Sequence, residues 1–249
     1  MGATSPVRLA RTSWRIDGKT IAASSNEPAC LAILDEALPL ARAPRDEPPD
    51  CLRVEIHVEP EWSPPIWLPQ AATLWSNGGP YRMCRVAEDP AVVYDRLGWA
   101  RFHSRERRIE IGGPPRLAED AFVLSQAIFA TLLPAALRSW GWLPLHAAAV
   151  DWGGRAVVFP AATGSGKSTL ALALVRAGFR LLADDMPILR PTADGAFTLR
   201  GFPERCRVLP GTLAFFPELR NATLGPSGPK LLVDPSAVYP GCFVDESLR

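Results

Sequence analysis

The sequence has no C-x-x-C pair, and its five cysteines are scattered through 249 residues. Their odd number and irregular spacing fit neither a zinc site nor a disulfide framework. Such cysteines are typical of a reducing compartment, so we expect a cytoplasmic protein. The N-terminal stretch, Met1–Trp14, has arginines but lacks the apolar core of a signal peptide, which agrees with that expectation.

An excess of charge is also missing, because 27 lysines and arginines balance 26 aspartates and glutamates. This balance argues against a nucleic-acid partner bound through a dominant basic surface, although a local basic patch stays open. The most membrane-like segment, Ala121–Leu137, is short for a span and contains Ser125, Gln126, Thr131 and Pro134. We therefore predict a buried helix there and no membrane partner.

Short strands dominate the predicted organisation of residues 1–115. In Leu52–Val58, apolar and polar residues alternate, which predicts a half-buried strand with His57 on its polar face. A hairpin is predicted around Asp17-Gly18, and a helix over Pro28–Leu40. Further strand candidates are Tyr81–Val86, Ala91–Tyr94, Ala100–His103 and Arg108–Ile111. These segments predict a small, mainly β N-terminal module for substrate or partner recognition.

Residues 116–249 are predicted to form a second domain. A long helix, Leu117–Trp140, opens it and is expected to be interrupted or kinked around Pro134. Two apolar runs, Leu145–Val150 and Ala156–Phe159, predict adjacent core strands. The second run leads into a glycine-rich loop and then into an apolar-periodic segment, Leu170–Ala177, which predicts a helix.

The glycine-rich loop has the sequence Pro160-Ala161-Ala162-Thr163-Gly164-Ser165-Gly166-Lys167-Ser168-Thr169. It matches the end of the phosphate-binding P-loop pattern, G-x-x-x-x-G-K-[ST], but has Ala161 in place of the first glycine. Glycines 164 and 166 permit the backbone N–H groups to curl around phosphate, and the following helix points its N-terminus at the same anion. The residues predicted to contact nucleotide are Ala162, Thr163, Gly164, Ser165, Gly166, Lys167, Ser168 and Thr169.

A second polar site follows the next predicted strand, Phe179–Ala183. Asp184 and Asp185 end this strand, where a P-loop protein needs an acidic group to hold Mg²⁺ or orient a nucleophile. Crowded carboxylates push their pKa values apart, which suits a general base beside a metal-linked acid. A capping turn is the alternative for this pair. On its own, His146 is more typical of a packed core histidine.

The segment from His146 to Asp185 resembles the catalytic core of the HPr kinase/phosphorylase family. That family joins a histidine strand, a P-loop, a helix ending in R-x-G and an R-L-x-A-D-D strand, and the same segments occur here in that order without a gap. The resemblance implies an α/β P-loop kinase core, with a mixed, largely parallel sheet flanked by helices. It also implies ATP- and Mg²⁺-dependent phosphorylation of a serine on a protein or peptide.

Carried over by position, the resemblance implies that Lys167 and the loop amides hold the triphosphate, while Ser168 and Asp185 ligate the metal. Asp184 would take the hydroxyl proton, with electrostatic support from His146. The family's E-[IV]-R-G-L-G segment, whose glutamate helps bind Mg²⁺, has no clear counterpart, and Glu204 is the nearest candidate.

The chain is more similar to the shorter HPr-kinase-related proteins, some of which accompany peptide-modifying gene clusters, including those for lasso peptides. A serine in a ribosomally made precursor peptide is therefore a better expected substrate than HPr itself. Two other functions stay open, namely a kinase of free amino acids and an ATP-binding regulator without transfer. The oligomeric state, including a homo-oligomer, and any phosphorylase activity also stay open.

Other P-loop classes fit the sequence less well. It contains neither the L-S-G-G-Q segment of ABC-type ATPases nor the N-K-x-D segment of GTPases. Near the C-terminus, Arg205, Arg207 and Lys230 are candidates for contact with phosphate or an acidic substrate, although solvated surface charges are the simpler interpretation.

Overall fold

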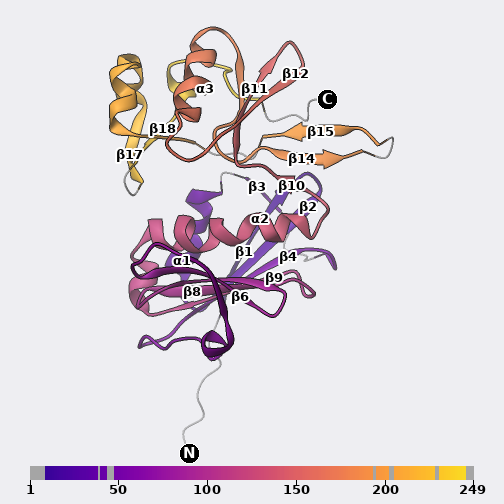
Figure 1. Cartoon of the computed structure of the whole chain (residues 1–249), viewed down its shortest axis with the longest axis vertical. Helices are drawn as coiled ribbons and strands as arrows, with labels where there is room; N and C mark the ends of the chain where they lie inside the picture. Colours follow the sequence, from indigo (N-terminus) through magenta and orange to yellow (C-terminus); the bar gives the residue numbers. More distant parts are fainter. Residues whose placement is uncertain are drawn as a thin grey trace, which may run out of the picture. The chain divides into compact units, whose positions relative to one another are not determined.

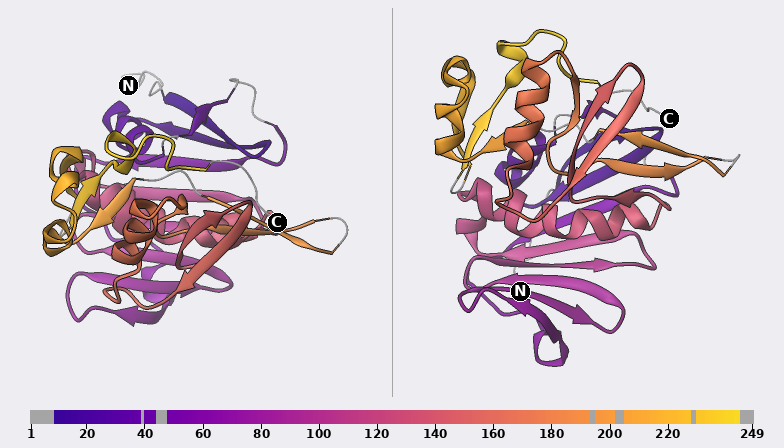
Figure 2. Two further views of the ribbon diagram at one scale, coloured as in Figure 1. Left: turned by 90° about the horizontal axis from the view of Figure 1, so that it is seen from above. Right: turned by 45° about the horizontal axis from the view of Figure 1, so that its top comes forward.

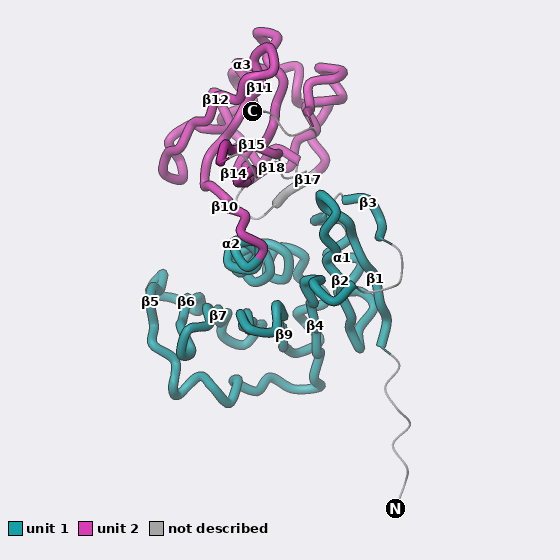
Figure 3. Tube along the Cα trace, turned by 90° about the vertical axis from the view of Figure 1, so that its right-hand side faces the viewer, with its two compact units in different colours: residues 1–139 teal, residues 140–249 magenta. Residues whose placement is uncertain are grey.

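The structure, a computed structural model, describes residues 9–38, 40–43, 48–192, 195–201, 205–227 and 230–244, without the side chains of residues 225–227. The chain divides into two compact units, residues 1–139 and 140–249, called unit 1 and unit 2 below (Figure 3). The boundary predicted from the sequence lies earlier, after residue 115. The difference arises because the long helical segment packs within unit 1.

Unit 1 contains a nine-stranded mixed sheet in the order β3-β1-β2-β4-β9-β8-β7-β6-β5 (Figure 1). The strands are β1 (Ala10–Ile16), β2 (Lys19–Ser25), β3 (Ala41–Arg42), β4 (Leu52–Val58), β5 (Ala72–Ser76), β6 (Tyr81–Val86), β7 (Asp89–Tyr94), β8 (Gly98–His103) and β9 (Arg108–Gly113). The β2–β4 and β4–β9 pairs are parallel, and the other neighbouring pairs are antiparallel.

Several elements of unit 1 follow directly from local sequence. Strand β4 has the predicted bounds, buries Leu52, Val54 and Ile56, and exposes His57. The β1–β2 hairpin turns at Asp17 and Gly18, both of which have positive φ, as a two-residue hairpin turn requires. The helices and turns are α1 (Pro28–Ala37), η1 (Leu68–Gln70), η2 (Pro115–Ala118), the π-helical segment η3 (Val123–Phe129) and α2 (Ala130–Arg138).

The segment η3–α2 is the long helix of unit 1 and packs on β7 and β8. Its irregular part is the π-helical stretch, and α2 continues through Pro134, so the helix is not interrupted at that residue. Buried residues recur along both parts, as expected for a helix that covers a sheet. None of the described helices is long and apolar enough to cross a membrane.

Unit 2 consists of three small sheets and one α-helix within its described residues. The sheets are β12 (Arg155–Pro160)–β11 (Ala147–Trp152)–β13 (Arg180–Ala183), β10 (Leu143–Pro144)–β14 (Ile188–Pro191)–β15 (Phe197–Arg200) and β16 (Cys206–Val208)–β18 (Lys230–Val233)–β17 (Thr223–Ser227). The helices are α3 (Lys167–Arg176), η4 (Pro210–Ala214), η5 (Pro217–Ala222) and η6 (Pro235–Ala237). Every strand pair within these sheets is antiparallel.

The expected helix-flanked, largely parallel P-loop core is therefore wrong. The described chain is mostly β, with few helices, and its strands are mostly antiparallel. Strands β11 and β12 are joined by the two-residue turn Gly153-Gly154, and a connection this short allows only antiparallel pairing. Helix α3 does cross from β12 to β13, but β11 lies between these two strands. Figure 2 shows the same strands and helix from two further directions.

Helix α3 is held on the sheet by an apolar core. Its buried residues Ala171, Leu172 and Val175 belong to one cluster with Ala148, Val150 and Leu181 from the strands. Burial of one valine or leucine side chain contributes roughly 1.5–3 kcal/mol. This packing fixes the N-terminus of α3 relative to the ends of the strands, and the candidate site forms at that end.

Candidate functional site

Antiparallel pairing gathers the predicted site residues at one end of the β12–β11–β13 sheet. The first residue of β11, Ala147, pairs with the last residue of β12, Pro160, and Ala149 pairs with Ala183 at the end of β13. His146 therefore lies next to the start of the glycine-rich loop and next to the aspartate pair, Asp184 and Asp185. A further hydrogen bond, from the N–H of Ala147 to the carbonyl of Asp185 at 3.1 Å, ties these strand ends together.

The glycine-rich loop has the backbone conformation that anion binding requires. Gly164 and Gly166 have φ of +82° and +94°, in the left-handed region that other residues rarely adopt. Gly166 is also the N-cap residue of α3, so the unpaired N–H groups of the first helical turn face the loop. Ala161 is not among the residues with positive φ, which explains why the first glycine of the pattern is dispensable here.

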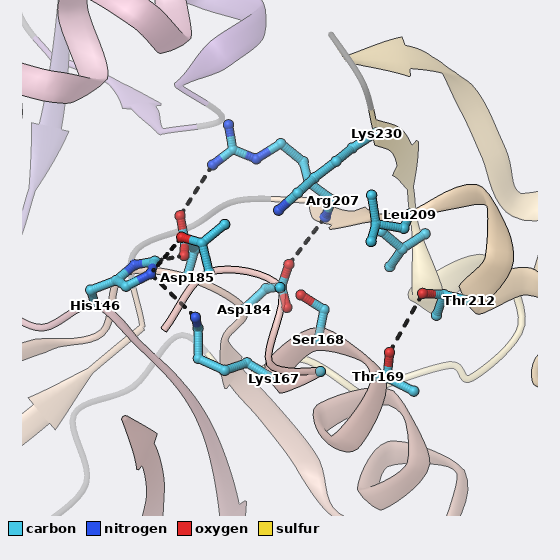
Figure 4. A pocket seen from close by; sticks show the side chains of 14 residues that line it. His146, Lys167, Ser168, Thr169, Asp184, Asp185, Arg207, Leu209, Thr212 and Lys230 are labelled. Carbon is cyan, nitrogen blue, oxygen red and sulfur yellow. Dashed lines mark hydrogen bonds and ion pairs between the residues drawn. The ribbon is translucent and has the colours of Figure 1, made fainter. Parts of the chain in front are cut away.

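The loop, the strand ends and the β16–β18 segment enclose a cavity of about 140 Å³ (Figure 4). It is lined by His146, Thr163, Gly164, Gly166, Lys167, Ser168, Thr169, Asp184, Asp185, Arg207, Val208, Leu209, Thr212 and Lys230. Ligand pockets for drug-sized molecules usually measure about 300–1,000 Å³. The enclosed space therefore suits the phosphate end of a nucleotide, with the rest of the ligand outside it.

Lys167 holds its amine at the mouth of the loop. Its Nζ donates to the carbonyl oxygens of Ala161 and Ala162, at 2.8 and 3.2 Å. It also lies 3.2 Å from Nε2 of His146. The two carbonyl oxygens are uncharged acceptors, so a phosphate oxygen would be a stronger partner for the same amine.

Asp184 is the most buried charged group of the site, with only 4% of its surface exposed. Its Oδ2 accepts a hydrogen bond from the backbone N–H of Arg207 at 3.1 Å. Burial raises the pKa of Asp184, and the negative charge of Asp185 acts in the same direction. Ser168, Arg207 and Lys230 counteract part of this rise. The second oxygen, Oδ1, is buried and lacks a well-formed hydrogen bond, although the Ser168 hydroxyl faces it (Figure 4).

Asp185 lies in a different environment, more open to solvent. Its Oδ1 is 3.0 Å from Nδ1 of His146, and its Oδ2 is 3.4 Å from the guanidinium of Arg207. The side chains of His146 and Asp185 are 53% and 37% exposed. Nε2 of His146 also lies 3.4 Å from the hydroxyl of Thr163, so the histidine bridges the aspartate pair and the loop.

The structure brings most of the predicted site residues into one cavity. Ala162 and Ser165 belong to the loop but do not line the cavity. Arg207 and Lys230, for which surface charge was the simpler interpretation, do line it, whereas Arg205 is exposed elsewhere. Thr212 was not singled out, because only the tertiary fold brings its hydroxyl within 3.5 Å of that of Thr169. Glu204 lies outside the described residues.

The donor set of the cavity fits a hard cation such as Mg²⁺. Mg²⁺ is usually held by one or two carboxylates, with substrate phosphates and water completing its shell. The cavity offers the Ser168 hydroxyl and the carboxylates of Asp184 and Asp185, and one oxygen of Asp184 is buried without a well-formed hydrogen bond. Within the described residues, no group of three or more His, Cys, Asp or Glu side chains is arranged as a metal site.

The comparisons with known proteins do not assign this chain to a family. No protein-family model matches it, and neither does any curated protein. The case for function therefore rests on the residues of the cavity and on the order of the sequence motifs that form it.

Proposed function

We propose that this chain is an ATP- and Mg²⁺-dependent kinase that transfers the γ-phosphate to a serine hydroxyl of a protein or peptide. The observation that carries the proposal is a single cavity in which a P-loop lysine, a helix N-terminus and an Asp-Asp-His cluster face one another (Figure 4). A phosphate-binding loop alone supports only anion binding. The acidic cluster opposite it adds groups that can hold a metal and accept a proton.

The residues of the cavity would divide the work as follows. The loop amides and Lys167 bind the β- and γ-phosphates and hold them in line with the acceptor. The oxygens of Ser168 and of the aspartate pair would hold Mg²⁺, which neutralises charge on the phosphates. Arg207 and Lys230 add positive charge on the opposite wall. The serine oxygen forms a bond to the γ-phosphorus, the bond to the β,γ-bridging oxygen breaks, ADP leaves, and the hydroxyl proton passes to a base of the cluster.

A peptide or protein acceptor agrees with the exposure of the cluster. More than half of the His146 side chain is accessible, so an acceptor hydroxyl can approach it from solvent. The resemblance of residues 146–185 to HPr-kinase-type cores supports serine as the acceptor residue.

The test is incubation with Mg²⁺ and ATP labelled in the γ-phosphate, offered in parallel to precursor peptides encoded beside the gene and to free serine. A labelled peptide that mass spectrometry locates at a serine supports the proposal. Labelled free serine would indicate a small-molecule kinase, and ATP binding without transfer would indicate a regulator. Lys167→Ala should abolish the signal, while the same change at Lys19, which pairs with Asp50 in unit 1, should not.

A further inference from the structure

Asp184 and Asp185 are neighbours in sequence, but their oxygens have different partners. Both oxygens of Asp185 are engaged, one by His146 and one by Arg207. Asp184 has one oxygen on the backbone N–H of Arg207 and one, Oδ1, that is buried and lacks a well-formed hydrogen bond. The Ser168 hydroxyl faces this oxygen and acts on the Asp184 carboxylate as a donor, but without a well-formed hydrogen bond (Figure 4).

A buried carboxylate oxygen that lacks a well-formed hydrogen bond is costly unless a cation or a better-aligned donor satisfies it. Ser168 is the hydroxyl that the P-loop pattern assigns to Mg²⁺, and it stands opposite that oxygen. A cation held between the two groups would satisfy both. Asp185 would first have to release His146 or Arg207, which makes it the less suitable ligand.

His146 has its own hydrogen-bond logic. A lysine ammonium can only donate, so Nε2 of His146 accepts at the 3.2 Å contact with Lys167. The ring proton then sits on Nδ1, which donates to Asp185. This arrangement aims an unprotonated nitrogen, oriented by a carboxylate behind it, into the open part of the cavity, as in nucleophile-activating Asp–His pairs. When Lys167 turns to a phosphate, Nε2 is released for another donor.

We infer a different assignment of roles from the one implied by the family resemblance: Asp184 ligates Mg²⁺ together with Ser168, and His146, positioned by Asp185, takes the proton of the acceptor hydroxyl. The inference rests on the proposed kinase function. His146 is then a catalytic residue, because it touches the acceptor, and Asp185 is a positioning residue. The proton moves from the serine hydroxyl to Nε2 as the oxygen bonds to the γ-phosphorus and ADP departs.

The assignment of Asp184 as the Mg²⁺ ligand is tested by measuring nucleotide binding, which requires no turnover. Isothermal titration gives the affinity for a non-hydrolysable ATP analogue with and without Mg²⁺ in the wild type, Asp184→Asn and Asp185→Asn. The increase in affinity caused by Mg²⁺ should fall at least about tenfold in Asp184→Asn and stay within about threefold in Asp185→Asn. Paramagnetic resonance of bound Mn²⁺ gives an independent readout on the same proteins.

The opposite pattern, loss of the Mg²⁺ effect in Asp185→Asn, overturns the inference and leaves the kinase proposal standing. Asp185 is partly exposed, so this variant remains informative even where Asp184→Asn fails to fold. Wild-type protein that binds nucleotide with no Mg²⁺ effect also overturns the metal assignment. Wild-type protein that binds no nucleotide overturns both proposals.

The base half is tested by chemical rescue. His146→Ala should lower the rate of transfer about 10²-fold or more while the affinity for Mg²⁺ and nucleotide is kept, and added imidazole should restore part of the rate. Asp185→Asn should lower kcat by a larger factor than it changes the KM for the peptide, because it disturbs the orientation of the His146 ring and not the binding of the acceptor. Full activity of His146→Ala, or a loss that imidazole does not relieve, would overturn the role of His146.

Discussion

Nδ1 of His146 lies 3.0 Å from Oδ1 of Asp185, and this contact joins the residue before β11 to the residue pair after β13. It exists because the two strands are antiparallel neighbours, so that the start of one meets the end of the other. Strand β12, on the opposite side of β11, delivers the phosphate loop to the same place. Three short strands thus assemble a candidate phosphotransfer site without a parallel sheet.

Gly166→Ala should lower the free energy of unfolding of unit 2 and also its affinity for nucleotide. A Cβ at Gly166 would meet no atom within 4 Å, so the cost comes from the φ of +94° and not from a clash. The left-handed conformation costs other residues about 1–2 kcal/mol, which should appear in the free energy of unfolding. Gly211→Ala is the matched control, because that site is equally open and has no positive φ. Equal losses in the two variants, measured by denaturant titration, would contradict this explanation.

Lys230→Ala should lower the affinity for ATP roughly three- to tenfold, because it removes a positive charge from the wall of the cavity. The loss should shrink as salt is added, since screening weakens the charge–phosphate attraction. Arg205→Ala provides the comparison, because Arg205 is exposed and does not line the cavity. Binding measured at low and high salt decides the matter, and an equal effect of both substitutions would argue for general surface charge.

Asp89 should make unit 1 sensitive to acid. Its Oδ1 accepts from the N–H and hydroxyl of Ser104, at 3.1 and 2.7 Å, and its Oδ2 lies 2.8 Å from Arg101. Burial raises the pKa of Asp89, but these donors outweigh it, so the pKa is below its ordinary value. A lowered pKa stabilises the fold above the unfolded-state pKa of about 3.9, and this contribution is lost as the pH falls through the folded-state value.

The free energy of unfolding of Asp89→Asn should therefore be about 1–2 kcal/mol lower than that of the wild type at neutral pH. Between about pH 5 and pH 2 it should fall less steeply than that of the wild type. Unfolding monitored across that range gives the comparison with the wild type. Glu61→Gln, a similar change at an exposed carboxyl, should leave the acid profile unchanged. Parallel profiles for wild type and Asp89→Asn would refute the assignment.

Gly201→Ala should be strongly destabilising for a steric reason. A Cβ at Gly201 would overlap the carbonyl oxygen of Leu182, which is backbone and cannot rotate away. Overpacking of this kind typically costs about 1–3 kcal/mol. Leu182 lies two residues before Asp184, so nucleotide affinity should fall together with stability. Retention of the wild-type Tm in this variant would show that the two segments are not so close.

The sequence predicts local structure well where pattern and turn chemistry act alone. Strand β4 and the hairpin at Asp17-Gly18 follow from alternation and from the need for positive φ. The conformation of the glycine-rich loop follows from its sequence, because Gly164 and Gly166, expected to allow the curled backbone, both have positive φ. Each of these features is decided within a few neighbouring residues.

Sheet order could not be predicted in the same way. Strand, loop, helix and strand follow one another from Arg155 to Ala183, as in a parallel βαβ unit, but β11 occupies the place between β12 and β13. The β11–β12 pair follows from the short turn Gly153-Gly154, but the pairing of β11 with β13 joins distant segments, which no local pattern reports. For the same reason, the sequence did not predict that Arg207 and Lys230 line the cavity, since β16 and β18 reach it only through the tertiary fold.

Strand β12, which leads into the glycine-rich loop, is an edge strand of its sheet among the described residues. A strand paired on one side opens at a lower free energy than a central one, and β12 shares this property with the other edge strands of unit 2. A ligand that binds only the closed loop adds its binding free energy to this weak margin, about 2.7 kcal/mol at a hundred times its Kd. Under the proposed function, nucleotide bound at this loop would therefore stabilise the β11–β12 hairpin against local opening.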